Sequence, residues 1–487
     1  MTNALKPALT LAALVSLVAL ATSGRAPAVE PTANAAAETA PAPNVLFVFA
    51  DQWRADALGY TGDPNVKTPH LDRLAEQAFN FPHAVSSCPV CSPYRATMMT
   101  GRRPLSHGVF LNDVQLSDDA LTIAEVAAAR GYQTAYIGKW HLDGHGRSAY
   151  IPPERRQGFE YFKALECTHN YNRSFYYAGD DPTKRVWEGY DAIAQTDDAI
   201  GYLRRHAHGD RPFLLVLSWG PPHNPYETAP ERFRAMYDPA AIRLRPNVPP
   251  DEADVARREL AGYYAHCSAL DECVGKLWRA LGELEIERDT IFVFTSDHGD
   301  MLHSHGEVRK QRPWDESIRV PLLVRYPRRL GESGRKLDAL INAQDLMPTL
   351  LGLAGVPIPA SVEGKDYSRY MQGGENPSDG AALVTCPSPF GEWTRARGGR
   401  EIRGLRTHRY TYVRSLDGPW LLYDNQNDPY QLDNLVGKPQ HAKLQAELDA
   451  RLRRKLRQTG DEFLPGAAYI EKWGYPVNET GTVPYTP

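Results

Sequence analysis

The chain has 487 residues, of which 42% are hydrophobic and 23% are charged, so it is long enough for one large domain with a smaller appended part. Its formal net charge of only -4 gives no compositional support for a nucleic-acid-binding surface. Six cysteines in a chain of this length exclude a scaffold built on disulfide bonds, and at most one or two bonds are expected.

Residues 1–43 have the composition of a targeting segment. Lys6 precedes an apolar run from Ala8 to Ala21, and small residues at its end offer cleavage sites. We therefore expect a signal peptide over residues 1–23 and a flexible leader rich in Ala, Pro and Thr over residues 24–43. The apolar run is too short for an ordinary membrane span. The mature chain is expected to lack such a span and to be exported to the periplasm or the extracellular space.

The first predicted elements are a buried strand and a helix. Val45–Ala50 is a continuous apolar run, typical of a strand buried on both faces, and it ends in Asp51 and Gln52. Thr68 and Pro69 then begin a helix whose apolar residues repeat at helical spacing.

The run CSPYRATMMTGR, which begins at Cys91, predicts a helix with a reactive residue in its first turn. Ser92 suits the N-cap, Pro93 the first helical position, and Gly101 the left-handed residue after the last turn. The free N–H groups at such a helix start, together with the charge of Arg95 one turn later, attract anions. An oxyanion substrate is the first hypothesis.

Cys88 and Cys91 also form the pattern CPVC, which keeps a redox pair or half of a zinc site open as alternatives to a catalytic Cys91. The chain has no second CxxC, and its remaining cysteines are scattered, which counts against a four-cysteine zinc site. This segment alone does not decide between the alternatives.

Three further strands are predicted downstream, and they alternate with helices. Thr122 and Glu125 form a capping box that begins one helix, and Val255–Leu284 is a long helix with one apolar face. Reactive side chains follow the strands: Lys139 and His141 after Thr134–Ile137, His223 after Phe213–Ser218, and Asp297 and His298 after Thr290–Thr295. The alternation predicts an α/β fold in which helices cover both faces of a mostly parallel sheet, with the ligand site beyond the carboxyl ends of the strands.

A metal ion and an anionic substrate are both expected at this edge of the sheet. Asp51, Gln52 and Asp297 offer oxygen donors that suit calcium or magnesium, and His298 leaves room for manganese. Lys310, in the loop before the strand Val320–Tyr326, is expected to be another anion contact. A cation beside residue 91 and a ring of positive side chains suit the hydrolysis of a tetrahedral anionic ester.

With these segments the chain resembles the type I sulfatases of the alkaline-phosphatase superfamily. CSPYR followed by ATMMTGR matches the CxPxR signature of that family, and GKWHL matches its second signature. ADQWRAD, TPHLDRLA, PPHNPY, TSDHGDML and ESIRVPLL resemble other family segments in the expected order. The resemblance implies an alkaline-phosphatase-like catalytic domain over residues 44–382 and a smaller α+β subdomain with an antiparallel sheet over residues 383–487.

The resemblance also implies a role for each matching residue. A maturation enzyme would oxidise Cys91 to formylglycine, whose hydrated aldehyde supplies the nucleophile. One calcium ion, in preference to magnesium or manganese, would be bound by the modified residue 91 together with Asp51, Gln52, Asp297 and His298. Arg95 and Lys139 would hold the hydrated aldehyde, and His141 would assist collapse of the sulfated intermediate. His223 and Lys310 would contact the sulfate, with His223 as the acid toward the leaving group.

Two positions depart from the pattern of the family, which often has Asp where Gln52 stands and Asn where His298 stands. The segment DQWRAD also resembles the phosphonate monoester hydrolases and phosphodiesterases of the same superfamily. GKWHL, with Lys139 and His141, favours sulfate esters over phosphate diesters.

Beyond residue 382 the sequence predicts short strands in EIRGLRT, RYTYVRS and PWLLYD and a final amphipathic helix over His441–Gln458. A loop before these strands contains Trp393, Arg395, Arg397 and Arg400, which either reach the mouth of the active site or are simply solvated. The solvated interpretation is preferred, because most loop residues carry no function.

Three functions remain open on the sequence. The first is a secreted sulfatase that acts on a carbohydrate or aryl sulfate and depends on a formylglycine-generating partner enzyme. The second is a phosphodiesterase or phosphonate monoester hydrolase on the same scaffold. The third is a catalytically silent binder of sulfated glycans, which the complete set of candidate residues argues against.

Overall fold

The computed structural model describes residues 41–486. The predicted signal peptide and nearly all of the predicted leader therefore lie outside the described residues. Among residues 41–486, no helix combines the length and the hydrophobicity that crossing a membrane requires.

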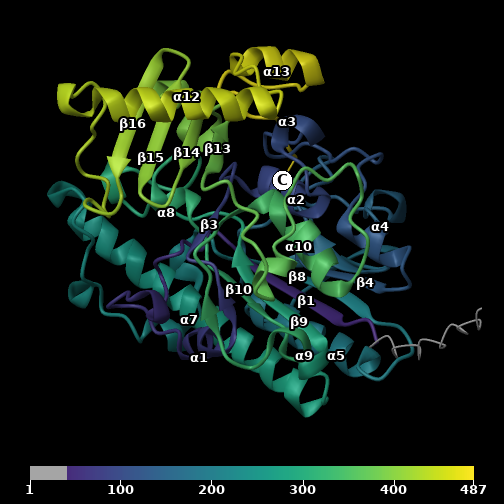
Figure 1. The fold of residues 1–487 in the computed structure, drawn as a ribbon. Coiled ribbons are helices and arrows are strands. Elements are labelled where there is room, and N and C mark those ends of the chain that lie inside the picture. The colour runs from purple at the N-terminus through teal and green to yellow at the C-terminus, as the bar shows by residue number, and fades with distance from the viewer. Residues whose placement is uncertain (1–40, 487) are drawn as a thin grey trace, which may run out of the picture. The chain divides into compact units, whose positions relative to one another are not determined.

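A ten-stranded mixed sheet forms the centre of the fold (Figure 1). Its strand order is β11-β2-β10-β9-β1-β8-β4-β5-β6-β7. The middle strands β9, β1, β8, β4 and β5 run parallel, and β10, β6 and β7 are antiparallel to a neighbour. The strands of this sheet are β1 Asn44–Asp51, β2 Phe79–Asn80, β4 Gln133–Lys139, β5 Tyr161–Leu165, β6 Phe175–Ala178, β7 Asp181–Val186, β8 Phe213–Pro222, β9 Thr290–Ser296, β10 Leu322–Arg325 and β11 Arg335–Lys336.

Helices cover both faces of this sheet. One layer contains α2, α4 and α10, and the other contains α1, α5 and α7. The α-helices are α1 Pro69–Gln77, α2 Cys91–Thr100, α3 Pro104–His107, α4 Ile123–Ala128, α5 Asp191–His206, α6 Glu231–Arg234, α7 Ala253–Glu283, α8 Asp315–Ile318, α9 Pro327–Leu330, α10 Leu346–Ala354, α11 Ser368–Met371, α12 Ala442–Gln458 and α13 Gly466–Trp473.

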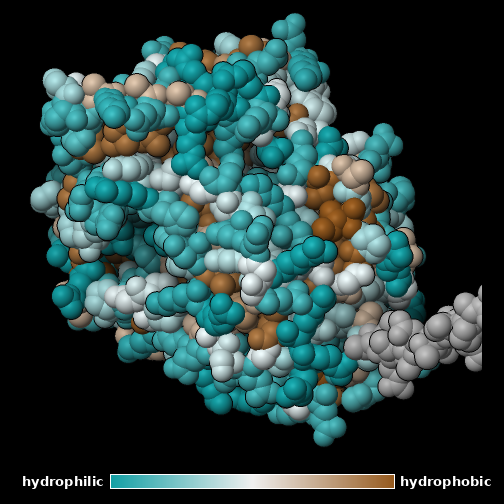
Figure 2. Space-filling model, in the orientation of Figure 1, coloured by the Kyte–Doolittle hydropathy of each residue, from teal (hydrophilic) through white to brown (hydrophobic). Residues whose placement is uncertain are grey.

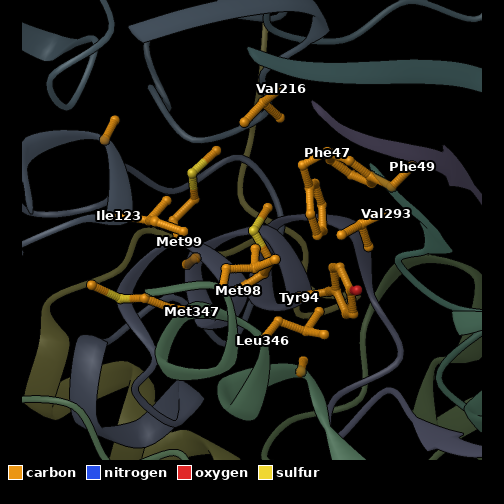
Figure 3. Close-up of a cluster of buried hydrophobic side chains, with 14 of the residues drawn as sticks. Phe47, Phe49, Tyr94, Met98, Met99, Ile123, Val216, Val293, Leu346 and Met347 are labelled. Carbon is orange, nitrogen blue, oxygen red and sulfur yellow. The ribbon is translucent and has the colours of Figure 1, made fainter. Parts of the chain in front are cut away.

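The central strand β1 contributes to both hydrophobic layers. Phe47 and Phe49 pack in the cluster that includes α2, whereas Leu46 and Val48 pack in the cluster that includes α7. Figure 3 shows the first cluster, in which the ring of Phe49 lies 6.4 Å from that of Tyr94 on α2. A strand buried on both faces needs an uninterrupted apolar run, and this requirement explains why the sequence of β1 shows no alternation.

A separate four-stranded antiparallel sheet lies in the C-terminal part, in the order β13-β14-β15-β16. Its strands are β13 Ala382–Cys386, β14 Ile402–Arg406, β15 Tyr410–Ser415 and β16 Gly418–Asp424. The helix α12 packs Leu448, Leu452 and Leu456 against this sheet, and four-residue spacing places the three side chains on one helical face. The two-stranded sheet of β3 His83–Val85 and β12 Leu340–Asn342 adjoins β13.

The α/β class, the mostly parallel central sheet and the antiparallel C-terminal sheet predicted from the sequence are confirmed. One local prediction is wrong, because α2 begins at Cys91 with Val90 as N-cap, so Ser92 is already inside the helix. The hydroxyl of Ser92 instead donates to the carbonyl oxygen of His141 at 2.7 Å. Gly101 ends the helix at φ 64°, as predicted.

The face drawn in Figure 2 is largely hydrophilic, with hydrophobic areas between polar ones.

Candidate active site

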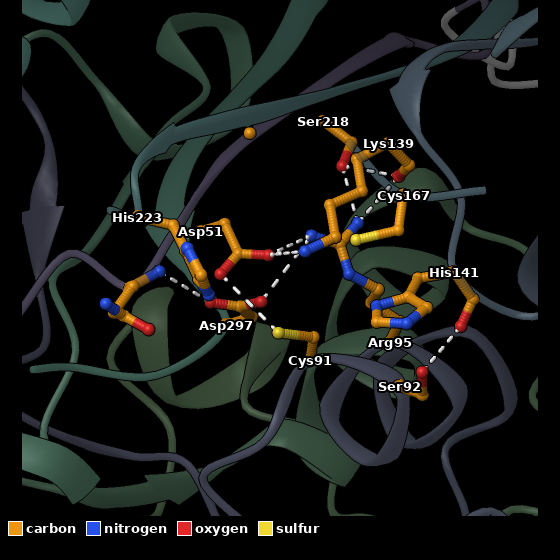
Figure 4. A network of polar contacts seen from close by, with 12 residues as sticks. Asp51, Cys91, Ser92, Arg95, Lys139, His141, Cys167, Ser218, His223 and Asp297 are labelled. Carbon is orange, nitrogen blue, oxygen red and sulfur yellow. Dashed lines mark hydrogen bonds and ion pairs between the residues drawn. The ribbon is translucent and has the colours of Figure 1, made fainter. Parts of the chain in front are cut away.

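The parallel strands bring their last side chains together at one edge of the central sheet, opposite the first turn of α2 (Figure 4). β1 ends at Asp51, β4 at Lys139 and β9 just before Asp297, while His223 directly follows β8. Each site residue predicted from the sequence is buried and belongs to this region: Asp51, Gln52, Cys91, Arg95, Lys139, His141, His223, Asp297, His298 and Lys310.

Cys91 lies at the centre of the group. Its Sγ is 3.5 Å from Oδ1 of Asp51 and 3.4 Å from Nε2 of His298. The ammonium group of Lys310 donates to the same sulfur at 3.2 Å. A group attached at position 91 is therefore held between an acidic side chain, an imidazole and a cation.

Two buried cations bind Asp51 from the other side. Nζ of Lys139 lies 2.7 Å and Nη2 of Arg95 lies 3.0 Å from Oδ2 of Asp51. Arg95 also donates through Nη1 to the hydroxyl of Ser218 at 2.6 Å and to the carbonyl oxygen of Lys139 at 2.7 Å. These bonds fix the guanidinium, so that its charge is preorganised.

The two carboxylates of the site have opposite pKa shifts. Burial alone would raise the pKa of Asp51, but the nearby positive charges, that of Lys139 above all, hold it well below its usual range. Burial and the charge of Asp51 raise the pKa of Asp297. Without a further cation the pocket therefore cannot readily keep both carboxylates ionised.

The donor atoms at this position fit a divalent cation. One ligand atom from each of Asp51, Cys91, Asp297 and His298 lies within 4.8 Å of the others. Nδ1 of His298 lies 2.9 Å from the carbonyl oxygen of Gly299, so a proton on Nδ1 leaves Nε2 free to bind a metal.

Gln52 completes this donor set. Its side-chain amide nitrogen donates to Asp300 at 2.7 Å, and its Oε1 is buried without a hydrogen-bond partner among residues 41–486. The backbone N–H of Gln52 donates to Oδ1 of Asp297, and an orphaned buried oxygen on the same residue is a group that a bound cation would satisfy. The oxygen-rich set suits a hard cation, while the imidazole of His298 also admits a softer one.

His223 and Lys310 form a hydrogen-bonded pair next to Cys91. Nζ of Lys310 lies 2.8 Å from Nε2 of His223, and Nδ1 of His223 lies 2.9 Å from the carbonyl oxygen of Asn224. Burial and the charge of Lys310 hold the pKa of His223 well below its usual range. His223 is therefore neutral with its proton on Nδ1, and the proton of the pair resides on Lys310.

His141 is oriented by an acidic residue that the sequence did not single out. Nε2 of His141 lies 3.3 Å from Oδ1 of Asp113, and Arg147 binds the same carboxylate with two hydrogen bonds of 2.8 Å. Burial would lower the pKa of His141, but the neighbouring Cys167 and Asp113 raise it to about 9.

A cavity of about 290 Å³ opens onto these groups. Cys91, Lys139, His141, His223 and Lys310 line it together with residues from distant segments: Asn112, Asp113, Arg147, Cys167, His169, Asn224, Gln311, Phe390, Gly391, Glu392, Thr482 and Tyr485. The ring of His169 stacks on that of His223 with centroids 4.5 Å apart, and the guanidinium of Arg147 lies over the ring of Tyr485.

The loop between β13 and β14, which contains Trp393 and the arginines singled out in the sequence, contributes to this cavity. It does so through other residues. Phe390, Gly391 and Glu392 line the cavity, whereas Trp393 is buried and Arg395 pairs with Glu401. Arg400 lies over the ring of Trp420. The solvated interpretation is therefore wrong for Trp393, which packs into a hydrophobic cluster with β14 and β16.

The alternative interpretations of CPVC receive no support. All six cysteines are free, so Cys88 and Cys91 do not form a disulfide bond. Burial raises the pKa of Cys88 to about 12, which makes this thiol unreactive. Cys91, but not Cys88, lies among the donor atoms that fit a divalent cation.

Sequence reasoning missed Asp113, Arg147, Cys167 and His169. None of them directly follows a predicted strand, and none belongs to the motifs that identified the other site residues. The nearest signal was the proximity of Cys167 and His169 to the end of β5, the strand next to β4.

Comparisons with known proteins agree with this geometry. The family model described as Sulfatase matches residues 43–356, and the model described as N-sulphoglucosamine sulphohydrolase, C-terminal, matches residues 304–458. The chain is 48% identical over 437 residues to the Ulvan-active sulfatase of Formosa agariphila, with 89% of this chain and 84% of that protein covered.

Two further known proteins are similar to this chain over most of their length. The chain is 30% identical over 471 residues to the Endo-4-O-sulfatase of Bacteroides thetaiotaomicron, with 82% of this chain and 89% of that protein covered. The crystal structure of the yidJ protein of Bacteroides fragilis superposes with a TM-score of 0.79 at 33% identity, covering 89% of this chain and 98% of that one.

Proposed function

Because this chain belongs to the sulfatase family, we propose that it hydrolyses a sulfate ester of a carbohydrate through a formylglycine made from Cys91. Family membership makes the chain a sulfuric ester hydrolase with the alkaline-phosphatase-like fold. Beyond family membership, we propose the carbohydrate substrate, the modified residue, the calcium ion, the roles of the site residues and the export of the chain.

The observation that carries the proposal is the environment of Cys91. Its side chain lies within 3.5 Å of Asp51, His298 and Lys310, in a cavity lined by cations. Oxidation of the Cβ–SH group to an aldehyde by a maturation enzyme gives a group whose hydrate supplies an oxygen nucleophile at this position. The first turn of α2 fixes that position.

The cationic side chains around residue 91 bind the sulfate ester. Lys139, His141 and Lys310 line the cavity and carry positive charge, which compensates the negative charge of the sulfate in a water-poor site. Arg95, fixed behind Asp51, adds a charge that needs no reorganisation during the reaction.

The pair Lys310 and His223 supplies the proton for the leaving alkoxide. In the resting arrangement Lys310 holds the proton and donates a hydrogen bond to the neutral Nε2 of His223. As charge develops on the leaving oxygen, Lys310 passes its proton to Nε2 of His223 and turns to a sulfate oxygen. The Nε2–H of His223 then faces the leaving oxygen and donates that proton to it. Compared with the sequence hypothesis, in which His223 alone is the acid, the geometry supports the pair.

His141 is the second group that can move a proton near residue 91. Asp113 holds the ring by its Nε2, and Nδ1 is buried without a hydrogen-bond partner among the described residues. This free nitrogen can exchange a proton with the group at position 91, so that His141 acts there as acid or base.

Asp51, Gln52, Asp297 and His298, with the modified residue 91, would hold one calcium ion. A bound divalent cation lowers the pKa of the group at position 91 and polarises a sulfate oxygen. The protein residues fix the positions of its ligands: the backbone N–H groups of Gln52 and His298 donate to Oδ1 of Asp297 at 2.9 and 2.8 Å.

The outer part of the cavity suits a sugar. His169 and Tyr485 offer ring faces, and Asn112 and Glu392 offer hydrogen-bonding groups for hydroxyls. The names of two relatives, Ulvan-active sulfatase and Endo-4-O-sulfatase, support a carbohydrate rather than a small aryl ester. The apolar run of residues 8–21 supports export, in keeping with an extracellular or periplasmic substrate.

The test compares ester classes on protein coexpressed with a formylglycine-generating enzyme. We expect sulfate release from sulfated oligosaccharides and from 4-nitrophenyl sulfate, with much slower hydrolysis of bis(4-nitrophenyl) phosphate. Cys91→Ala is expected to abolish turnover, whereas Cys88→Ala, the matched change of a buried cysteine outside the site, is expected to retain it. Faster hydrolysis of the phosphate diester would overturn the proposal in favour of the phosphodiesterase alternative.

A further inference from the structure

A second group of metal-binding side chains lies outside the active site. His83 belongs to β3, Asp338 precedes β12, and His408 lies in the turn between β14 and β15. One ligand atom of each lies within 4.8 Å of the other two. We propose that these three residues bind a transition-metal cation of the zinc class, which connects the C-terminal sheet to the core. This inference does not depend on the sulfatase activity.

The two distances from the imidazoles to the carboxylate match edges of a coordination tetrahedron, and the two imidazole nitrogens lie within 4.8 Å of each other. Nε2 of His83 lies 3.2 Å and Nε2 of His408 lies 3.1 Å from Oδ1 of Asp338. Ligands about 2.0–2.1 Å from a tetrahedral zinc ion are about 3.3 Å from one another. Each ring nitrogen thus already has nearly the required spacing from the carboxylate.

The backbone holds the two histidines in place before any metal binds. His83 is paired in register with Leu340 between the parallel strands β3 and β12. The turn that carries His408 is closed by hydrogen bonds between Thr407 and Tyr410, at 2.8 Å in each direction. The ligands therefore come from two preformed elements, and only the exposed carboxylate of Asp338 has to adjust.

Two positive side chains near His83, those of Arg319 and Arg406, act against the binding of a cation there. Both arginines also pair with Asp315, Arg406 through two contacts of 2.8 Å, which offsets their repulsion toward a cation.

The donor set indicates the class of metal. Two imidazoles and one carboxylate suit zinc and its neighbours among the divalent transition metals, rather than calcium or magnesium. Three protein ligands on a surface where Asp338 is 78% exposed leave a fourth position for water. Nδ1 of His83 has no hydrogen-bond partner among the described residues, so we expect weaker binding than in a four-ligand structural site.

The position of the group explains what a bound metal would do. Directly beside it, Val85, Leu340 and Val384 pack in a small cluster that joins β3 and β12 to β13. The chain that leaves β13 continues to Phe390 and Glu392 in the wall of the active-site cavity. A metal bound by His83 and His408 would therefore cross-link the core and the C-terminal sheet, and would stabilise the folded state by mass action.

The test is a zinc titration of the full-length protein kept in excess calcium, which occupies the hard-ligand position of the active site. We expect His408→Ala and Asp338→Asn each to bind one equivalent of zinc fewer than the wild type by calorimetry. We also expect zinc to raise the unfolding temperature of the wild type by about 2 °C or more, and to raise that of neither variant. His208→Ala, which removes an exposed histidine elsewhere, serves as the matched control and should behave like the wild type.

Cobalt provides an independent readout, because a tetrahedral site with two imidazoles gives Co²⁺ a visible absorption far more intense than the weak band of six-coordinate aqueous Co²⁺. We expect this band in the wild type and in His208→Ala, and its loss in His408→Ala. Equal zinc stoichiometry in the wild type and His408→Ala, or no zinc-dependent stabilisation of the wild type, would overturn the inference. The unfolding temperatures in chelator separate either result from a folding defect of a variant.

Discussion

Asp51 and Asp297 are predicted to respond differently to the same substitution, although both belong to the proposed calcium site. Oδ2 of Asp51 balances two buried cations, Lys139 at 2.7 Å and Arg95 at 3.0 Å. The nearest such contact of Asp297 is Arg95 at 3.5 Å, and burial together with the charge of Asp51 raises its pKa. Without metal, the negative charge of Asp51 compensates the buried charges of Lys139 and Arg95. The negative charge of Asp297 compensates much less positive charge, so losing it costs less.

In the presence of a chelator, Asp51→Asn is therefore expected to lower the free energy of unfolding by about 3–5 kcal/mol, the usual cost of leaving buried charges unpaired. Asp297→Asn keeps an oxygen that can accept the backbone N–H groups of Gln52 and His298 and is expected to cost about 1 kcal/mol or less. Both substitutions remove a proposed calcium ligand, so both are expected to abolish sulfate release.

The assay is urea unfolding of the wild type and the two variants in chelator, followed by fluorescence, and then again in calcium. Calcium is expected to stabilise the wild type and to have little effect on either variant. Equal destabilisation by the two substitutions in chelator would refute the electrostatic account of the pocket. Calcium stabilisation of both variants equal to that of the wild type would refute the assignment of the ligands.

Three other predictions concern single side chains. Lys310→Met, which removes the proton of the Lys310 and His223 pair, is expected to lower kcat about 100-fold or more, and a change below threefold would contradict the proton path. Asp113→Asn, which loosens the ring of His141, is expected to lower kcat about 10-fold or more with a smaller change in KM, so an unchanged kcat would contradict the positioning role. Burial alone would lower the pKa of His303, but the carboxylates of Glu259 and Glu252 raise it. Protonated His303 therefore stabilises the folded state fully at pH values below about 6.5, the pKa of histidine in the unfolded chain. This stabilisation is lost as pH rises through the higher pKa of His303 in the folded state. The unfolding temperature of His303→Gln, measured across this pH range, should lack the corresponding decline, and the same decline in wild type and variant would contradict the assignment.

The parts of the site that lie at the ends of buried strands could be predicted from the sequence. The apolar run before Asp51 and the one before Asp297 specify strands buried on both faces, and parallel strands bring their carboxyl ends together. Hydrophobic patterning therefore determines both the sheet and the place of these side chains. The helix that begins with Cys91 is predicted instead from its end signals, of which Gly101 is confirmed and the capping role of Ser92 is not.

Residues whose function depends on contacts between distant segments could not be predicted in this way. Asp113 contacts His141 only because the loop after α3 folds over the end of β4. No local sequence pattern predicts this contact. Tyr485 reaches the cavity from the end of the chain and packs there on Arg147. Side-chain packing across the fold, rather than local propensity, sets these positions.

The central claim is that the group at position 91, converted from cysteine to an aldehyde, performs the attack on the sulfate ester. The most direct measurement is quantitative mass spectrometry of the peptide containing residue 91, in preparations matured to different extents and assayed for sulfate release. The account predicts that the rate per molecule rises in proportion to the fraction of aldehyde and approaches zero when residue 91 is entirely thiol. Full activity in protein whose residue 91 is unmodified cysteine would contradict it.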